Sequence, residues 1–301
     1  MNQFDGVCER LGVPIANEKT EGLTTILKYL GLTIDIQNMV VKIPADTVKE
    51  LLNQIKTVAS AKKVTLNQLQ SLCGLLAFCT KALPAGRAFS RQLYMATSKA
   101  SKPFHFIRVT KNMFEDLMIW KYFLEEFNGI THILDETWLS NYDLQLFNDS
   151  SGLAENGCSG YFMGRWFFLQ WPKEWENTDI LKDMTYLEII PIALAIYLWN
   201  AELFKKRVLF HVDNMAVVAI LNKKTSKSAR ALNILRRIVY WTLIGNCHIK
   251  AVYIESSKNV LADALSRRQF QKFRQRAPQA DPFPTQVPLE FLSVLKENIE
   301  D

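Results

Sequence analysis

The spacing of apolar residues changes near residue 130, and this change limits the folds open to the 301-residue chain. Before it, apolar residues recur every three or four positions, which is typical of amphipathic helices. After it, short runs rich in β-branched and aromatic residues come first, and strands then alternate with helical stretches. We therefore predict an α+β or α/β chain, in which a helical region precedes a mixed five-stranded sheet with flanking helices.

The helical region covers residues 44–130 and follows a first segment, 1–43, of different character. In that first segment, residues 24–35 predict a strand pair with Gly31 as a bulge. Pro44 suits the first turn of a helix, and Thr65 suits an N-cap. Two further helices are expected from Arg87 onward and over residues 111–127.

The sheet region covers residues 140–270. Its strands are predicted at 144–149, on either side of a turn at 163–165, at 207–213 and at 248–254. Helices are predicted from 185 to 199 and over 214–221, 229–244 and 259–268. The tail, 271–301, contains proline, and because the stretch after Arg276 is rich in it, we expect a flexible linker there.

Positive charge is concentrated in one part of the chain. Residues 205–276 hold sixteen Lys and Arg against three acids (Asp213, Glu255 and Asp263), a local balance of +13, whereas the whole chain carries +6. Such a segment indicates a polyanionic partner, most simply nucleic acid. The alternative is that these Lys and Arg side chains only lie on the solvent-exposed faces of helices.

Several classes of protein are unlike this sequence. It has no uncharged apolar run of about 18 residues, so we expect no membrane span. Its five cysteines are scattered and form no Cys-x-x-Cys pair, which argues against a disulfide framework or a zinc site. The first residues lack the pattern of a secretory signal. We expect a cytoplasmic or nuclear protein.

Four carboxylates are expected to meet at one edge of the sheet. Asp149 ends the first strand, and Asp213 ends a strand reached through a helical crossover, so the two lie together if these strands are parallel neighbours. Glu188 begins the crossover helix, and Asp263 lies near the start of the last helix. Such a cluster repels itself unless cations neutralise it, and its hard oxygen ligands favour two Mg²⁺ or Mn²⁺ ions.

Each acid also has a purely structural explanation. Thr185 and Glu188 fit a capping box, in which Glu188 only returns a bond to the N-cap. Asp213 fits an N-cap for the helix that follows it. Asp263 fits a solvated acid near a helix N-terminus, and Asp149 fits a turn residue.

Four segments that carry these acids resemble the ribonuclease H domain of retroelement reverse transcriptases. They are residues 147–152 (Phe-Asn-Asp-Ser-Ser-Gly), 186–189 (Tyr-Leu-Glu-Ile), 210–214 (Phe-His-Val-Asp-Asn) and 259–267, which ends in Ala-Asp-Ala-Leu-Ser-Arg. Residues 28–35 resemble the end of a polymerase palm. Residues 72–78 and 86–90 resemble the thumb and connection of DIRS-type retrotransposons.

The resemblance implies a two-metal endonuclease that cuts the RNA strand of an RNA–DNA hybrid. The metal ligands of the family correspond to Asp149, Glu188, Asp213 and Asp263. Further contacts to the hybrid are expected from small polar and basic residues, namely Ser150, Ser151, Asn214, Lys223, Lys224, Lys227 and Arg230.

The chain departs from the family pattern in two places. The polymerase motif Tyr-x-Asp-Asp is absent, so we expect no polymerase activity and interpret residues 1–43 as a palm remnant of a longer element. The loop at 255–258 has no His, which many cellular members carry before the last acid. Two rival hypotheses are a non-catalytic nucleic-acid-binding remnant and a DNA-cutting or strand-transferring relative on the same fold.

Overall fold

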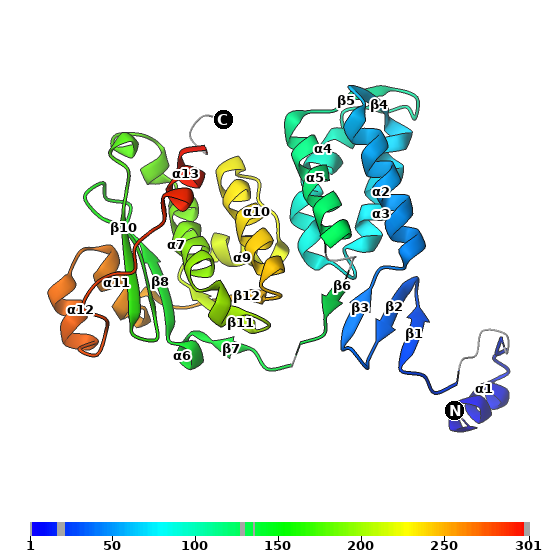
Figure 1. Ribbon diagram of the computed structural model, residues 1–301, viewed down its shortest axis with the longest axis horizontal. Coiled ribbons are helices and arrows are strands. Elements are labelled where there is room, and N and C mark those ends of the chain that lie inside the picture. The colour runs from blue at the N-terminus through cyan, green and yellow to red at the C-terminus, as the bar shows by residue number, and fades with distance from the viewer. Residues whose placement is uncertain (1, 17–21, 127–129, 135, 298–301) are drawn as a thin grey trace.

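The structure is a computed structural model that describes residues 2–16, 22–126, 130–134 and 136–297. Its elements form two groups that lie side by side (Figure 1). The chain passes from the helical group to the sheet group between β6 (Ile130–His132) and β7 (Leu139–Ser140). A short helix, α1 (Asn2–Leu11), precedes both. The expectation of a mixed α and β chain is confirmed, with several small sheets.

A four-stranded antiparallel sheet opens the helical group. Its order is β1-β2-β3-β6, and its first three strands are β1 (Ile26–Tyr29), β2 (Leu32–Asp35) and β3 (Val40–Lys42). The predicted bulge at Gly31 is wrong. Leu30 and Gly31 have φ values of 48° and 80° and form a two-residue hairpin turn, whose twist matches that of the flanking strands.

Helices cover most of residues 44–126, as the apolar spacing predicts. They are α2 (Ala45–Ser60), α3 (Leu66–Cys79), the 3₁₀ helix η2 (Pro84–Phe89), α4 (Arg91–Thr97) and α5 (Lys111–Glu126). Thr65 is confirmed as an N-cap, because its hydroxyl accepts from the Gln68 amide at 3.2 Å. Pro44 is the N-cap of α2 and not a residue of its first turn. Phe127 lies outside the described residues.

A two-stranded ribbon, β4 (Lys63–Thr65) with β5 (Phe106–Arg108), joins the ends of these helices. The sequence pattern did not predict it, because three-residue strands are too short to show a period. The helix expected from Arg87 begins at Arg91, after the 3₁₀ turn.

The sheet group contains all five predicted strands. They are β8 (Leu146–Ser150), β9 (Gly157–Phe162), β10 (Arg165–Gln170), β11 (Arg207–Val212) and β12 (His248–Tyr253). The turn between β9 and β10 is confirmed at Met163 and Gly164, which both have positive φ.

Together with β7, these five strands form two three-stranded sheets, β10-β9-β8 and β12-β11-β7. The short helix α6 (Asn141–Leu144) separates β7 from β8. β7 pairs with the start of β11, with Leu139 opposite Val208. β8 lies beside β11, but in the described chain no hydrogen-bonded ladder joins these two strands. A single five-stranded ladder is therefore not what we observe.

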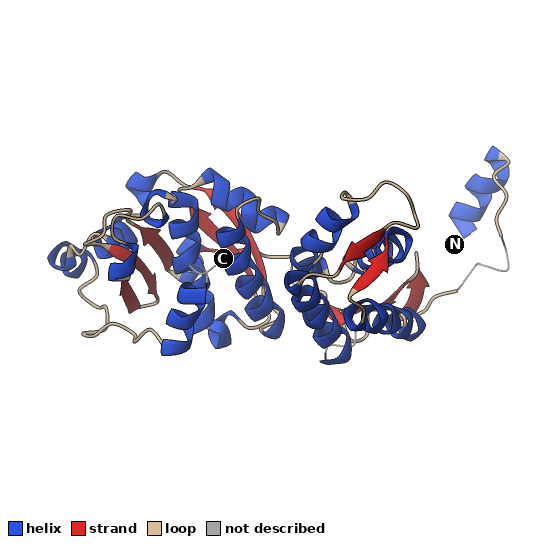
Figure 2. Ribbon diagram, turned by 90° about the horizontal axis from the view of Figure 1, so that it is seen from above, coloured by secondary structure: helices blue, strands red, loops and turns tan. Residues whose placement is uncertain are grey.

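Helices pack on both faces of the antiparallel strands (Figure 2). The group holds α7 (Met184–Leu198), α8 (Asn200–Leu203), α9 (Met215–Lys223), α10 (Ala229–Ile244), α11 (Val260–Ser266) and α12 (Phe270–Arg276), with 3₁₀ turns η3 (Lys173–Trp175), η4 (Ile180–Lys182) and η5 (Ser256–Lys258). Phe162 and Phe167 enter the core with α7, whereas Tyr161 and Trp166 pack against α11 and α12. This alternation is the period-2 pattern of strands buried on both faces.

The prediction of a flexible linker after residue 276 is wrong. The tail lies along β10, where the Trp166 indole donates to the carbonyl of Asp281 at 2.8 Å and the Thr285 amide donates to the carbonyl of Trp166 at 2.7 Å. It ends in α13 (Leu289–Glu297), whose Phe291 packs with its ring centroid 6.0 Å from that of Trp241. The prolines remove backbone donors, but the neighbouring amides and apolar side chains still hold the segment in place.

Within the described ranges, no helix combines the length and the apolar character needed to cross a bilayer.

Candidate metal centre

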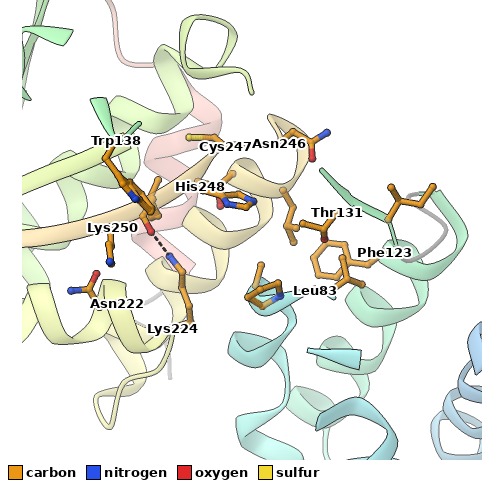
Figure 3. A pocket seen from close by; sticks show the side chains of 16 residues that line it. Leu83, Phe123, Thr131, Trp138, Asn222, Lys224, Asn246, Cys247, His248 and Lys250 are labelled. Carbon is orange, nitrogen blue, oxygen red and sulfur yellow. Dashed lines mark hydrogen bonds between the residues drawn. The ribbon is translucent and has the colours of Figure 1, made fainter. Parts of the chain in front are cut away.

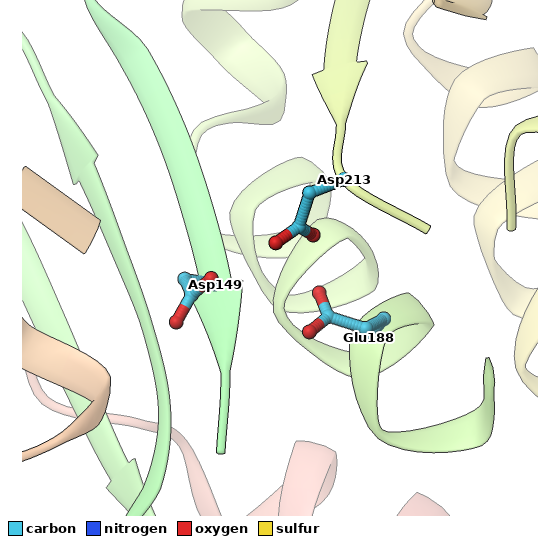
Figure 4. A group of neighbouring side chains, drawn as sticks. All are labelled: Asp149, Glu188 and Asp213. Atoms are coloured by element: carbon cyan, nitrogen blue, oxygen red, sulfur yellow. The ribbon is translucent and has the colours of Figure 1, made fainter. Parts of the chain in front are cut away.

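Three of the predicted acids meet at one edge of the sheet group (Figure 4). Asp149 lies in β8, Asp213 follows the last residue of β11, and Glu188 projects from the first turns of α7. Each offers a carboxylate oxygen, and these oxygens all lie within 4.8 Å of one another. The strand ends and the crossover helix thus bring together residues that are up to 64 positions apart in the sequence.

Packing of α7 against β8 directs Glu188 toward this edge. The Ser150 hydroxyl donates to the carbonyl of Leu187 at 2.8 Å, which ties the strand to the helix. Asp183, and not Thr185, is the N-cap of α7, because its carboxylate accepts from the Tyr186 amide at 3.0 Å. The capping-box explanation of Glu188 is therefore wrong.

Asp213 is also free of the capping role that its position suggested. Asn214 is the N-cap of α9, since its side-chain oxygen accepts from the amides of Ala216 at 2.9 Å and Val217 at 3.2 Å. One oxygen of Asp213 accepts from the Ser256 hydroxyl at 2.8 Å. Its carboxylate remains directed at the other two acids (Figure 4).

Burial makes the group electrostatically costly. Asp149 is 4% exposed and Glu188 is 5% exposed. Burial, reinforced by the charges of Asp213 and Asp263, raises the pKa of Asp149 to about 7, although a hydrogen bond from Ser266 opposes this rise. Burial also raises the pKa of Glu188 well above its ordinary value, with further contributions from Asp149 and Asp213.

Asp263, the fourth predicted ligand, lies outside the group of three. Its carboxylate accepts from the Arg267 guanidinium at 2.6 Å, one helical turn further along α11. Its charge nevertheless contributes to the raised pKa of Asp149, so it lies within electrostatic reach of the group. The hydrogen bond to Asp263 raises the pKa of Arg267, and the charges of Asp263, Asp149 and Asp213 raise it further.

Sequence reasoning missed three side chains that hold these acids. The Ser266 hydroxyl donates to Asp149 at 2.5 Å, Ser256 donates to Asp213, and Arg267 pairs with Asp263. The spacing of Asp263 and Arg267 at i and i+4 on one helix is a signal that predicts their ion pair. Nothing comparable marks Ser256, which comes from a separate loop.

Most residues predicted to contact a nucleic acid have other partners within the fold. Ser150 and Ser151 are buried, and the Ser151 hydroxyl accepts from the Asn156 side chain at 2.9 Å. Arg230 pairs with Asp179 at 3.3 Å. Lys223 and Lys227 are exposed. Lys224 lies at a cavity described below.

Three converging carboxylates suit a hard divalent cation. Oxygen ligands at one small site are the donors that Mg²⁺ and Mn²⁺ prefer, and a cation relieves the repulsion that, in addition to burial, raises the pKa values of Asp149 and Glu188. The residues present therefore fit a metal centre. Comparison of the sequence with protein-family models and with curated proteins gave no match.

Proposed function

We propose that this protein is a metal-dependent endonuclease that cuts the RNA strand of an RNA–DNA hybrid. The single observation that carries the proposal is the convergence of Asp149, Glu188 and Asp213 within 4.8 Å at the ends of two strands and the start of a crossover helix. Acids with purely structural roles are not expected to converge on one site, and two of these three are buried. Their mutual repulsion costs stability, and such sites persist where the arrangement serves a function.

Asp149, Glu188 and Asp213 would hold the divalent ions, and Asp263 would join them after it leaves Arg267. Bound in pairs, such ions stabilise the charge that develops on the attacking and leaving oxygens of a phosphodiester. The chain's own contribution is to fix the acids: Ser266 orients Asp149, Ser256 orients Asp213, and the Ser150 amide bonds Glu188.

A polyanionic substrate is supported by the charge distribution. Residues 205–276 carry a local balance of +13, and the exposed Lys223 and Lys227 belong to this segment. Basic side chains that neutralise phosphates supply most of the affinity for a nucleic acid and make it depend on salt. The choice of a hybrid as substrate comes from the resemblance to retroelement ribonuclease H domains, as does the proposal of a ribonuclease H-like arrangement for β8 to β12.

The test is cleavage of an RNA–DNA hybrid, labelled on either strand, by the whole chain with Mg²⁺, Mn²⁺ or EDTA. We expect metal-dependent cutting of the RNA strand and none of the DNA strand. Duplexes of DNA alone and of RNA alone serve as substrate controls. Cutting of the DNA duplex would instead support the DNA-cutting relative.

Two substitutions separate an enzyme from a binding protein. Asp213→Asn removes one metal ligand, and we expect it to abolish cleavage while hybrid binding persists. Asp46→Asn, at an exposed position in the first turn of α2, makes the same chemical change far from the site and should leave cleavage unchanged. Hybrid binding by the wild type without cutting under any metal would support the non-catalytic remnant.

A further inference from the structure

A cavity of about 260 Å³ lies between the helical group and the sheet group (Figure 3). The helical group lines it with Leu83, Phe123 and Thr131. The sheet group lines it with Trp138, Lys224 and His248. Both groups therefore line one partly open cavity, and an occupant would contact both of them.

This cavity is separate from the metal centre. His248 begins β12 opposite Arg207 at the start of β11, whereas Asp213 follows the other end of β11. A strand rises about 3.3 Å per residue, so six residues place the two sites roughly 20 Å apart. A ligand in the cavity would not touch the carboxylates.

The charged side chains that line the cavity are cationic. Lys224 and Lys250 line it, and no Asp or Glu is present among the described residues of its wall. Burial lowers the pKa of His248, and the positive charges of Arg207 and Lys224 lower it further. A cation-bearing wall without carboxylates favours an anionic occupant.

Lys224 is the central feature of this wall. Its ammonium donates to the carbonyl of Ile249 at 3.4 Å, which is long for a hydrogen bond, and no ion pair of Lys224 occurs within the described part of the chain. Burial lowers the pKa of Lys224 to about 8. Lys224 also has a φ of 53° at the end of α9, a conformation in which glycine is more usual.

Apolar and aromatic side chains line both sides of the cavity, with Leu83 and Phe123 on one side and Ile249 and Trp138 on the other, and uncharged polar residues such as Asn222 complete the wall. Lys250 is exposed and its ammonium lies over the Trp138 ring, whereas Lys224 is half-buried. The single ammonium of Lys224 balances one negative charge better than a phosphate dianion, which needs several donors. The volume is near the lower end of ligand pockets, which begin at roughly 300 Å³. The space therefore suits a molecule of one or two rings.

We propose that this cavity binds a small aromatic carboxylate, with the carboxylate at the Lys224 ammonium and the rings among the apolar side chains of both groups. Binding would give the Lys224 ammonium a partner of opposite charge and would raise the pKa of Lys224. The ligand would bridge the helical and sheet groups and so stabilise their association.

The test uses 2-naphthoate and its neutral analogue 2-naphthamide, titrated into the whole chain by calorimetry without divalent metal. The two probes share their rings and differ in charge. We expect naphthoate to bind at least about ten-fold more tightly than naphthamide, because the charge-assisted hydrogen bond is made only by the anion. Affinity for naphthoate should fall by about ten-fold or more from about pH 7 to about pH 10, as Lys224 loses its proton.

Variants locate the site. Lys224→Met keeps the apolar stem and removes the charge, so it should weaken naphthoate binding by about ten-fold and leave naphthamide unaffected. Lys223→Met, at the exposed neighbouring position, makes the same change outside the cavity and should alter neither. Equal affinity for the two probes, an unchanged Lys224→Met variant, or no naphthoate binding at millimolar concentration would each overturn the proposal. The comparison of probes and the pH series need only the wild type, so they hold even if the variant does not fold.

Discussion

The helical group and the sheet group both bury acids, but they treat them in opposite ways. In the helical group, Asp116 of α5 has no exposed surface and forms an ion pair with Arg236 of α10. In the sheet group, Asp149 and Glu188 are almost as deeply buried, yet their nearest charged neighbours are other acids. The ion pair of Asp116 with Arg236 joins two elements of the fold, whereas the cluster that contains Asp149 and Glu188 adds electrostatic repulsion to the folded state.

This difference distinguishes a structural ion pair from the acids that we propose as metal ligands. Burial raises the pKa of Asp116 to about 7, and the positive charge of Arg236 opposes that rise. Asp149 has a pKa raised to about 7 as well, but there neighbouring carboxylates add to the effect of burial. Burial is the main cause of the raised pKa at both acids, but only at Asp149 is there added repulsion from a carboxylate cluster that a metal ion would relieve.

The largest effect is expected from a substitution in the acid cluster. Asp149→Asn removes a proposed metal ligand while it keeps an oxygen that accepts from Ser266. We expect hybrid cleavage to fall by about 10³-fold or more, since the cation site loses a charged ligand. The free energy of unfolding in EDTA should rise by roughly 2 kcal/mol, because a buried carboxylate and its repulsion are removed. Urea denaturation with a parallel cleavage assay measures both.

A fall in stability for Asp149→Asn would show that this carboxylate is a structural residue, contrary to the comparison. Asp46→Asn, at an exposed position of α2, is the control and should change neither quantity.

Loss of the ion pair between Asp116 and Arg236 should have the second largest effect. Arg236→Met leaves Asp116 buried without its cation, so the free energy of unfolding should fall by about 3 kcal/mol. The double substitution Asp116→Leu with Arg236→Met removes both charges and should return to within about 1 kcal/mol of the wild type. Arg237→Met, at the exposed adjacent position, is the control. Urea denaturation of the four proteins would contradict this account if the double variant were the least stable.

The titration of Asp149 should make both the Mn²⁺ affinity and the stability of the protein depend on pH. A metal ion needs the ionised carboxylates, so Mn²⁺ affinity should fall by about ten-fold for each pH unit below 7, where Asp149 takes up a proton. In EDTA the folded state binds this proton more tightly than the unfolded state, whose Asp has a pKa of about 3.9. The contribution of Asp149 to stability should therefore increase as pH falls from about 8 to about 5.

Mn²⁺ titration followed by electron paramagnetic resonance measures the first effect, and urea denaturation in EDTA measures the second. Asp149→Asn supplies the control, since it should lose that part of the stability profile. An Mn²⁺ affinity that does not change between about pH 8 and about pH 6 would show that the acids are already ionised without metal.

The smallest expected effect concerns Arg267, which serves as an internal cation for Asp263. Arg267→Met should free Asp263 to bind metal and so increase Mn²⁺ affinity by about three-fold, the amount typical of an exposed ion pair. Arg268→Met, at the next position, is the control, because the Arg268 guanidinium donates to the carbonyl of Glu155 and not to an acid of the cluster. Weaker Mn²⁺ binding by Arg267→Met would show that Arg267 supports the metal centre instead of competing with it.

The elements that bring the acids together can be predicted from the sequence alone. The helices of residues 45–126 and the order of the strands from β8 to β12 follow from apolar spacing, because buried faces repeat with the period of each element. The convergence of Asp149, Glu188 and Asp213 follows from the same order, since a crossover returns the chain to the same sheet edge. These features depend on local preference and on connection rules.

Many hydrogen-bond and ion-pair partners of individual side chains depend on tertiary packing and could not be predicted from the sequence. Asp183 instead of Thr185 caps α7, Ser256 reaches Asp213 from a separate loop, and Arg267 withdraws Asp263 from the acids. The tail that composition suggests is flexible packs along β10. Lys224 is basic in the sequence like its neighbour Lys223, and only its place at a cavity between two groups lowers its pKa. The physical reason is that burial, which sets the cost of a charge, depends on residues distant in the chain.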